Sequence, residues 1–491
     1  MGGRFDVQSR LMASRLRAAK QRGGNRRELW IAVVTAAICL LVAGWARAEN
    51  TKQFDWGALT REATDLLSNY IKINTTNPPG NELAAAKMLK EKFLHDGIPA
   101  AVFEPAHGRG VVAARLRGVG KHHKALILLS HMDVVPADPK DWSVPPFSGQ
   151  VKAGEVWGRG ALDDKGPGVI ELMAMLAIKR ARVLLDRDIL FIATADEEVG
   201  GKIGAGWVAE HQANLYKDAG YVLNEGGGIR TDRAGHQFYS VAITEKSPLW
   251  LRLTASDATG HAASPPEHTA VTRLVTALHK LVDYRAPIKV LPVVQEYFRK
   301  LAVLDQNQPK LLDLRAALAD PDFVKEFVSL PHQNAMVRDT LTPTVLSAGY
   351  KTNIIPSTAS AEIDCRLLPD EDPKAFIKVI RELIGDDKIK IEQLLSFPTL
   401  ASPEKSELMS AIVTLARRKD KDAAVIAALL TGFNDSHYFR QHGLVAYGFI
   451  PIETTDQESH MIHGANERIP IKTLGGGIER MVELLRIMGG Q

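Results

Sequence analysis

Short apolar runs followed by polar residues are the feature that most constrains the fold of this chain. Residues 124–130 (KALILLS) and 188–194 (DILFIAT) are short and almost wholly apolar, which predicts strands buried on both faces. Between them, residues 166–182 repeat apolar side chains at helical spacing. Residues 220–223 and 444–450 predict two more buried strands. This alternation of strands with a helix predicts an α/β domain with a mostly parallel central sheet.

A second pattern begins near Ser247 and follows the order strand, helix, strand, strand, helix, strand. In chain order, the predicted elements are residues 249–255, 269–282, 344–349, 359–367, 373–384 and 388–394. This order is that of the split βαβ, or ferredoxin-like, unit. A charged and mostly helical segment, about residues 285–342, is inserted after its first helix. We predict an α+β domain of residues 247–396, inserted into a first domain of residues 50–246 and 397–491.

The N-terminus is typical of an export signal or a membrane anchor. Residues 1–48 hold nine of the 61 Lys and Arg residues but only two of the 57 Asp and Glu residues, and residues 29–45 form an apolar run. The sequence Ala46-Arg47-Ala48 matches a small-x-small cleavage pattern. Because positively charged flanks stay in the cytoplasm, we expect the body to be periplasmic or extracellular. Cleavage after Ala48 is favoured over an uncleaved anchor at residues 29–45.

Charge and cysteine content exclude two kinds of site. The full chain has a net charge of +4, but without its first 48 residues the net charge is about −3. That part shows no basic stripe with interleaved aromatic residues, so we expect no nucleic-acid binding. The two cysteines, Cys39 and Cys365, are too few for a thiolate zinc site. Any metal must therefore be held by His, Asp and Glu.

Polar clusters lie next to the predicted strands. Residues 130–133 (SHMD), 196–198 (DEE) and 224–225 (NE) follow three of the strands. Residues 158–166 (GRGALDDKG) lead into the first helix, and residues 460–464 (HMIHG) come after the last strand. Because the carboxyl ends of parallel strands share one edge of a sheet, we expect the five clusters to lie together.

Each cluster taken alone also has an ordinary structural explanation. Asp163 and Asp164 could cap the helix that follows them, because carboxylates favour helix N-termini. A single histidine after a strand is more often a hydrogen-bonded structural residue than a ligand. Five clusters at one sheet edge nevertheless favour a metal site, because imidazole and carboxylate are the ligands of catalytic zinc. The same ligands also accept cobalt and manganese.

The chemistry of a two-metal site explains these residue types. Two metals about 3.5–4 Å apart need a bridging carboxylate, and water bound there has a pKa of about 7. A carboxylate next to that water must take its proton and pass it to the leaving amine. Adjacent residues such as Glu197 and Glu198 suit a division into base and ligand. Asp133, two residues after His131, could orient that imidazole by a hydrogen bond.

Seven segments, in this order, resemble one known family. They are SHMDVVP (130–136), GRGALDDKG (158–166), TADEEVGG (194–201), NEGG (224–227), GHAASP (260–265), TNIIPSTASAEIDCRLLP (352–369) and IHGANERIP (462–470). The family is the dinuclear zinc peptidase family of glutamate carboxypeptidase, aminoacylase, succinyl-diaminopimelate desuccinylase and carnosinase. The resemblance covers about residues 60–480. Together with GRGALDDKG, WSVPPFSG (142–149) is most similar to the exported branch with Gly-X carboxypeptidase and secreted N-acyl-amino-acid hydrolases.

The resemblance implies a zinc-peptidase catalytic domain with two zinc ions and five ligands. The ligands are His131, Asp163, Glu198, Glu225 and His463. Asp163 would bridge the two metals, and the peptide bond after it would be cis. Glu225 would share one metal with His131, and Glu198 would share the other with His463.

The resemblance also implies the residues that act on the substrate. Glu197 would be the general base, with Asp133 beside the site. The inserted domain would be a lid and dimerisation domain, so the chain would form a homodimer. From this domain, His261 would stabilise the oxyanion, often from the partner subunit. Asn353 and Arg366 would contact the substrate, Arg366 through the substrate's carboxylate.

Two points stay open at this stage. His460 competes with His463 as the last metal ligand, although IHGANE (462–467) matches the family's final motif at His463. The helical segment of about residues 285–342 is longer than in the compact relatives. This length leaves the contacts of the lid and the geometry of the dimer open.

The leading hypothesis is a metallo-exopeptidase or aminoacylase that cleaves the amide bond of a peptide C-terminus, a dipeptide or an N-acyl amino acid. Arg366 favours a substrate with a free carboxylate, because guanidinium binds that group bidentately. The alternative is an exported binding protein of the same fold without activity, and the presence of Glu197 argues against it. A serine hydrolase is disfavoured because the chain has no G-x-S-x-G motif.

Overall fold

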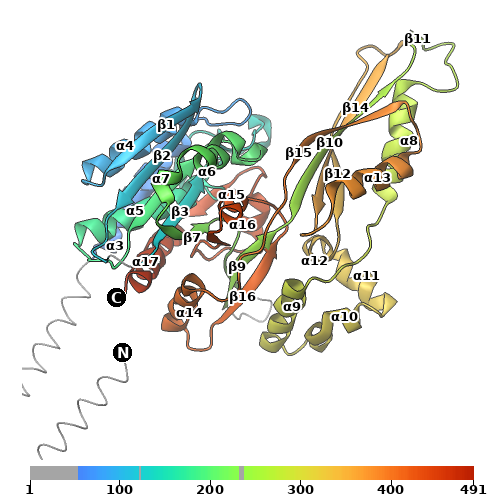
Figure 1. Ribbon diagram of the computed structural model, residues 1–491. Coiled ribbons are helices and arrows are strands. Elements are labelled where there is room, and N and C mark those ends of the chain that lie inside the picture. The colour runs from blue at the N-terminus through green and yellow to red at the C-terminus, as the bar shows by residue number, and fades with distance from the viewer. Residues whose placement is uncertain (1–53, 121–122, 232–236, 491) are drawn as a thin grey trace, which may run out of the picture. The chain divides into compact units, whose positions relative to one another are not determined.

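The computed structural model describes residues 54–120, 123–231 and 237–490 (Figure 1). Residues Trp56–Gln491 form one compact unit. The predicted export segment, residues 1–48, lies outside the described residues. Within the part of the chain that the structure describes, no helix has both the length and the apolar character needed to cross a membrane.

A nine-stranded mixed sheet, in the order β1-β2-β6-β3-β7-β17-β9-β16 with β8 paired to β9, forms the centre of this unit. Its middle strands are β6 (Ile189–Thr194), β3 (Ala125–His131), β7 (Ala219–Asn224) and β17 (Val445–Gly448), and they run parallel. Every residue of β3 and β6 is buried. The apolar runs therefore correctly predicted doubly buried strands and an α/β fold.

Strands that the sequence analysis did not predict extend this sheet on both sides. At one edge, β1 (Ala100–Ala106) pairs antiparallel with β2 (Arg109–Leu116), which pairs antiparallel with β6. At the other, β9 (Gln237–Glu245) pairs parallel with β16 (Ala424–Leu430) and antiparallel with β8 (Gly228–Thr231). The edge strand β1 has no fully buried residue. Its apolar run is short, because Glu104 and Pro105 follow Phe103, and such short runs do not identify a strand.

Helices cover both faces of the central sheet (Figure 1). They are α3 (Trp56–Ile71), α4 (Glu82–His95), α5 (Lys165–Arg180), α6 (Trp207–His211), α7 (Ala213–Tyr216), α14 (Glu407–Lys419), α15 (Ser436–Gln441) and α17 (Ile471–Met488). The short helix α16 (Asp456–Met461) packs instead against β18 (Arg468–Pro470). Helix α5 packs against β3 and against α3 and α17. Its first fourteen residues are all buried. On the opposite face, Ile127 and Leu129 of β3 pack against side chains of α6, α7 and α15.

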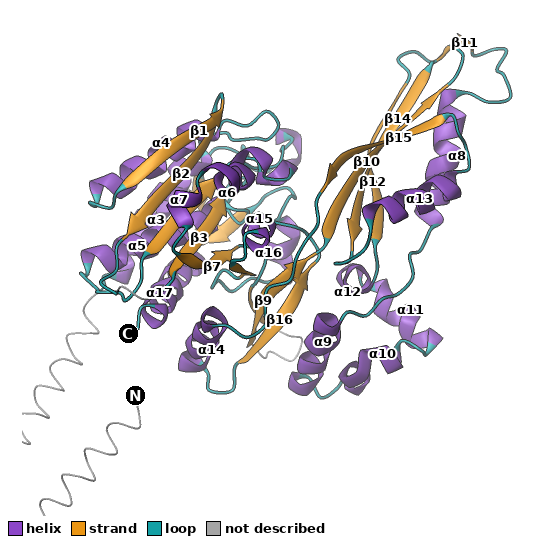
Figure 2. Cartoon of the chain, viewed as in Figure 1, coloured by secondary structure: helices purple, strands orange, loops and turns teal. Residues whose placement is uncertain are grey.

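A second, four-stranded antiparallel sheet has the order β12-β14-β10-β15, and two helices cover one of its faces (Figure 2). Its elements are β10 (Ser247–Ser256), α8 (Ala270–Asp283), β12 (Thr340–Ala348), β14 (Thr358–Leu367), α13 (Pro373–Ile384) and β15 (Ile389–Ser396). Buried and more exposed residues alternate along β10 and β14, because the two helices cover only one face. The element order is the predicted one, and the division into separate domains stays a prediction.

Two small sheets complete the fold. β11 (Gly260–His261) pairs with β13 (Ile354–Ile355). β18 (Arg468–Pro470) pairs with β5 (Glu155–Trp157), which pairs with β4 (Gln150–Lys152). The second of these sheets joins segments that lie more than 300 positions apart in the sequence. It ties the residues before α5 to the residues before α17.

The predicted helical insertion contains four α-helices and one short 3-10 helix, Pro309–Asp313. The α-helices are α9 (Pro292–Leu304), α10 (Leu314–Ala317), α11 (Pro321–Ser329) and α12 (Pro331–Val337). Phe298 and Phe327 meet with ring centroids 5.1 Å apart in an apolar cluster that also contains Leu429 of β16. Helix α9 packs against β16, the last strand of the central sheet. The insertion therefore covers a strand edge that would otherwise be open to pairing with another chain.

Phe298→Ala should lower the free energy of unfolding by about 3–5 kcal/mol, because it leaves a cavity in this apolar cluster. Val303→Ala on the same helix is the matched control, since Val303 is 58% exposed, and should change stability by less than about 0.5 kcal/mol. Urea unfolding measures both variants. Equal effects of the two substitutions would contradict the packing of α9 described here.

Candidate metal centre

The five polar clusters meet at one edge of the central sheet. His131 is the last residue of β3, and Glu225 directly follows β7. Glu197 lies in a short helical turn, Glu197–Val199, after β6. The peptide bond between Asp163 and Asp164, just before α5, is cis, as the family resemblance implies. The predicted convergence at the carboxyl ends of the parallel strands is thus observed.

The carboxylate of Asp163 lies between two imidazoles. Its Oδ1 is 2.9 Å from Nε2 of His131, and its Oδ2 is 3.2 Å from Nε2 of His463. Glu198 Oε2 is also 3.2 Å from Nε2 of His463. Because its two oxygens face different imidazoles, Asp163 has the placement that a bridging ligand requires.

The other carboxylates near His131 complete its side of the centre. Glu225 Oε1 lies 3.8 Å and Glu197 Oε2 lies 4.0 Å from Nε2 of His131. The His131 side chain is only 2% exposed, whereas that of His463 is 54% exposed. Of the two histidines that competed for the last position, His463 is the one next to Asp163 and Glu198. His460 ends up in the last turn of α16.

This concentration of acids is electrostatically costly without a cation. Burial raises the pKa of Glu197 well above its ordinary value. Burial also raises the pKa of Glu198, and the negative charge of Asp163 adds to this effect. Glu198 Oε1 is buried without a hydrogen-bond partner. Two imidazoles, a bridging carboxylate and an unpaired buried carboxylate oxygen fit a site for divalent metal ions.

Asp133 organises the turn that carries the two glutamates. Its carboxylate accepts hydrogen bonds from the backbone N–H groups of Glu197 and Glu198, both at 3.1 Å, and from Asn77 Nδ2 at 2.8 Å. His131 Nδ1 lies 3.0 Å from the backbone carbonyl of Asp133 and 3.6 Å from its carboxylate. The imidazole is thus oriented mainly by the backbone of Asp133, not by the carboxylate as the spacing suggested.

A loop between β16 and α15, which the sequence pattern did not predict, also supports the centre. Asp435 Oδ2 accepts a hydrogen bond from Thr194 Oγ1 at 2.7 Å, and Asn434 Nδ2 donates to the backbone carbonyl of Glu225 at 2.7 Å. Ser436 Oγ accepts from Asn224 Nδ2 at 3.2 Å. The run Asn-Asp-Ser just after a short apolar segment was the signal that could have identified it.

Arg366, His261 and Asn353 were expected to contact the substrate from the inserted domain. Arg366 lies near the metal centre, and the other two lie elsewhere. Arg366 donates to Asp364 from Nε at 2.7 Å and from Nη2 at 2.9 Å, and its guanidinium carbon lies 4.6 Å from the ring centroid of Phe433. Phe433 directly precedes the supporting loop, so Arg366 lies beside the residues that hold the centre. His261, on β11, and Asn353, before β13, are exposed. No contact between these two and the ligand candidates is found among the described residues.

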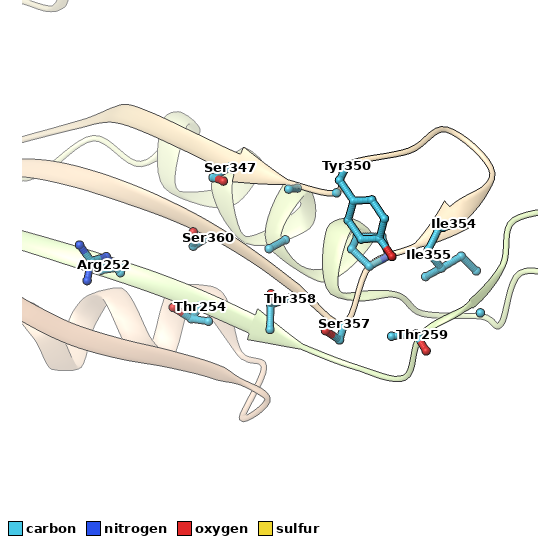
Figure 3. Close-up of a pocket in the computed structure, with 15 residues that line it drawn as sticks. Arg252, Thr254, Thr259, Ser347, Tyr350, Ile354, Ile355, Ser357, Thr358 and Ser360 are labelled. Atoms are coloured by element: carbon cyan, nitrogen blue, oxygen red, sulfur yellow. The ribbon is translucent and has the colours of Figure 1, made fainter.

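A pocket of about 630 Å³, lined in part by Thr259 and Gly260, lies at the end of the second sheet (Figure 3). Its lining includes Arg252 and Thr254 of β10, Ser360 of β14, and Tyr350. None of the five ligand candidates lines it. This pocket is therefore separate from the candidate metal centre.

Comparisons with known proteins match this architecture. The model described as "Peptidase family M20/M25/M40" matches residues 127–487. The N-fatty-acyl-amino acid synthase/hydrolase PM20D1 of Xenopus tropicalis is 30% identical over 378 residues, which are 75% of this chain and 73% of that protein. Aminoacylase-1 of Sus scrofa is 27% identical over 425 residues, 86% of this chain and 93% of that protein.

Solved structures show the same fold. The M20 family metallo-carboxypeptidase Sso-CP2 from Sulfolobus solfataricus superposes with a TM-score of 0.68 at 20% identity, covering 88% of this chain and 100% of that one. Human carnosine dipeptidase 1 superposes with a TM-score of 0.66 at 17% identity, covering 89% and 98%. These likenesses establish the expected combination of a central α/β sheet and an additional smaller sheet.

The metal-free protein should lose stability as the pH rises, in part through Glu225. Burial, and then the charge of Asp163, raises the pKa of Glu225 from 4.5 to about 8. The folded state therefore keeps a proton that the unfolded chain has lost, and this contribution to stability disappears between pH 4.5 and about 8. We expect Glu225→Gln to reduce the loss by up to about 1.4 kcal/mol per pH unit.

Urea unfolding of metal-free wild type and Glu225→Gln across this pH range measures the difference. Parallel stability curves for the two proteins would contradict the raised pKa of Glu225.

Proposed function

This chain belongs to peptidase family M20/M25/M40. From that premise we propose that it is an amide hydrolase that uses two metal ions, and zinc is the metal that we favour. The carboxylate of Asp163 between His131 and His463 is the observation that carries the proposal. Cobalt and manganese suit the same nitrogen and oxygen ligands. The proposed ligands therefore suit any of these three ions.

The proposed ligands divide into two sets that share Asp163. His131 and Glu225 would hold one ion, and His463 and Glu198 would hold the other. Bound zinc supplies Lewis-acid polarisation of the scissile carbonyl and lowers the pKa of water. The chain's own part is to hold these ligands in a largely buried cluster, where water screens their charge less than at the surface.

Glu197 is the proposed general base. Its carboxylate is buried beside the ligands, and the backbone N–H groups of the turn that carries it are held by Asp133. From this position its carboxylate can take a proton from the attacking water and return it to the leaving nitrogen. The buried position beside the ligands therefore supports the proposed role of Glu197 as the general base.

The proposed substrates are a peptide C-terminus, a dipeptide or an N-acyl amino acid, each with a free carboxylate. The relatives are named as an N-fatty-acyl-amino acid synthase/hydrolase, an aminoacylase and a carnosine dipeptidase. Each of these names indicates a substrate with an amide bond to an amino acid. Arg366 lies beside the metal-centre loop and can bind a carboxylate bidentately. For this it must leave or share its pairing with Asp364.

The test is a hydrolysis screen of dipeptides, peptides with varied C-terminal residues and N-acyl amino acids, with metal analysis of the same sample. Turnover by protein that holds about two metal ions supports the proposal. Protein that binds metal yet hydrolyses none of these amides would instead support a binding protein of the same fold.

Glu197→Gln should reduce kcat by about 10²–10⁴-fold, because it removes the proton acceptor. The metal content should stay at that of wild type, because Glu197 is not one of the proposed ligands. Elemental analysis and steady-state kinetics on one preparation test both points. Wild-type turnover, or loss of metal in parallel with turnover, would remove Glu197 from this role.

We further propose a homodimer formed through residues 247–396, acting as a lid and dimerisation domain. Strand β12 is at the edge of its sheet and exposes Val345 and Leu346 at 48% and 64%, and Tyr350, just beyond its end, is 83% exposed. An exposed apolar strand edge favours pairing with a second copy. Because His261 makes no contact with the ligands of its own chain among the described residues, we propose that it stabilises the oxyanion of the partner's site, with Asn353 beside it.

Mixed dimers test this arrangement. His261→Ala and Glu197→Gln should each be nearly inactive alone. When the two variants are coexpressed, a mixed dimer combines an intact Glu197 with an intact His261 from the partner at one of its two sites. Random assortment should then restore activity to about a quarter of the wild-type value. No restoration in dimers purified with two different tags would contradict the shared site.

Export remains part of the proposal. The basic and apolar N-terminal segment supports delivery to the periplasm or the extracellular space, with cleavage after Ala48 or anchoring through residues 29–45.

A further inference from the structure

We propose that a buried ion pair between Arg159 and Glu467 is a positioning device that fixes the distance between Asp163 and His463. This inference rests on the proposed two-metal function. Arg159 lies four residues before Asp163, and Glu467 lies four residues after His463. The pair thus joins the two loops that carry these ligands, although they are about 300 positions apart in the sequence.

Glu467 holds the loop of Asp163 through both carboxylate oxygens. Its Oε1 accepts hydrogen bonds from the backbone N–H groups of Leu162 at 2.7 Å and Asp163 at 3.1 Å. Its Oε2 accepts from the backbone N–H of Gly160 at 3.0 Å and from Arg159 Nη1 at 2.6 Å. The Glu467 side chain is 0% exposed. A single buried carboxylate therefore fixes the backbone of the proposed bridging ligand.

Arg159 holds the loop of His463 from the other end of the pair. Its Nη2 donates to the backbone carbonyl of His463 at 3.2 Å and to that of Gly464 at 3.0 Å. His463 has a φ of 61°, in the left-handed region that non-glycine residues adopt only at a cost. The guanidinium contacts thus support a backbone conformation that the local sequence does not itself favour.

The two proposed metal positions depend on this pair to different degrees. His131 belongs to a buried central strand, and its neighbour Glu225 follows another, so the sheet holds both. His463 lies in a loop, and its side chain is 54% exposed. We therefore expect the metal shared by Glu198 and His463 to depend on the pair, and the metal shared by His131 and Glu225 to depend on it much less.

Pairing of β5 with β18 provides a second connection between the same segments. In addition, the backbone N–H of Gly158 donates to the carbonyl of Glu467 at 2.9 Å. These bonds should keep the segments together when the side-chain pair is changed. The pair can therefore be altered without separating the two loops.

The test compares zinc affinities of the full chain with those of Arg159→Lys and Glu467→Gln, by titration against a competing chelator. Lysine keeps the charge at position 159 but lacks the planar fork that reaches a carboxylate and two carbonyls at once. Both variants should bind the zinc ion shared by Glu198 and His463 about 10–100-fold more weakly. The ion shared by His131 and Glu225 should be weakened much less, because it is affected only through Asp163. If Glu467→Gln does not fold, the zinc affinities of the milder variant Arg159→Lys are sufficient to test the inference.

Arg440→Lys is the matched control. Arg440 Nη1 forms an equally buried pair with Glu245 at 2.8 Å, and its other hydrogen bonds go to Ser402 and Ala446, neither of which is a proposed metal ligand. This control should lower the melting temperature and leave both zinc affinities unchanged. Equal weakening of both sites, or of neither, in the Arg159 and Glu467 variants would contradict the inference. Wild type that binds fewer than two zinc ions would instead refute the proposed function.

Discussion

Close packing of acidic side chains around one edge of the central sheet is the constraint on which the rest of the structure depends. Asp163, Glu197, Glu198 and Glu225 lie together with His131, and burial raises the pKa of the three glutamates. Such a cluster opposes folding unless cations or protons balance it. A rigid and deeply buried scaffold around the cluster is one way to withstand this cost.

The scaffold combines parallel strands with buried polar supports. The strands supply His131 and Glu225 at their ends, where the backbone is fixed by the sheet. Loops supply the other ligands, and these loops are held by Asp133 and by the pair of Arg159 and Glu467. Because strands fix some of the ligands and buried polar contacts fix the loops that carry the others, a centre assembled from distant segments can be preorganised before substrate binds.

The sequence predicted the parts of this arrangement that depend on local patterns. Apolar runs identified the central strands, and polar clusters at their ends identified the ligand candidates. Edge strands such as β1 escaped prediction because their residues are partly exposed. The support from Asp435 and Glu467 also escaped, because their partners, Thr194 and Arg159, lie more than 200 positions away. Contacts at such a distance leave no periodic signal in one sequence.

Anomalous diffraction from zinc-loaded crystals tests the central claim most directly. Two peaks about 3.5–4 Å apart should flank the carboxylate of Asp163, one beside His131 and Glu225 and the other beside His463 and Glu198. A single peak, or peaks that do not contact Asp163, would contradict the dinuclear centre.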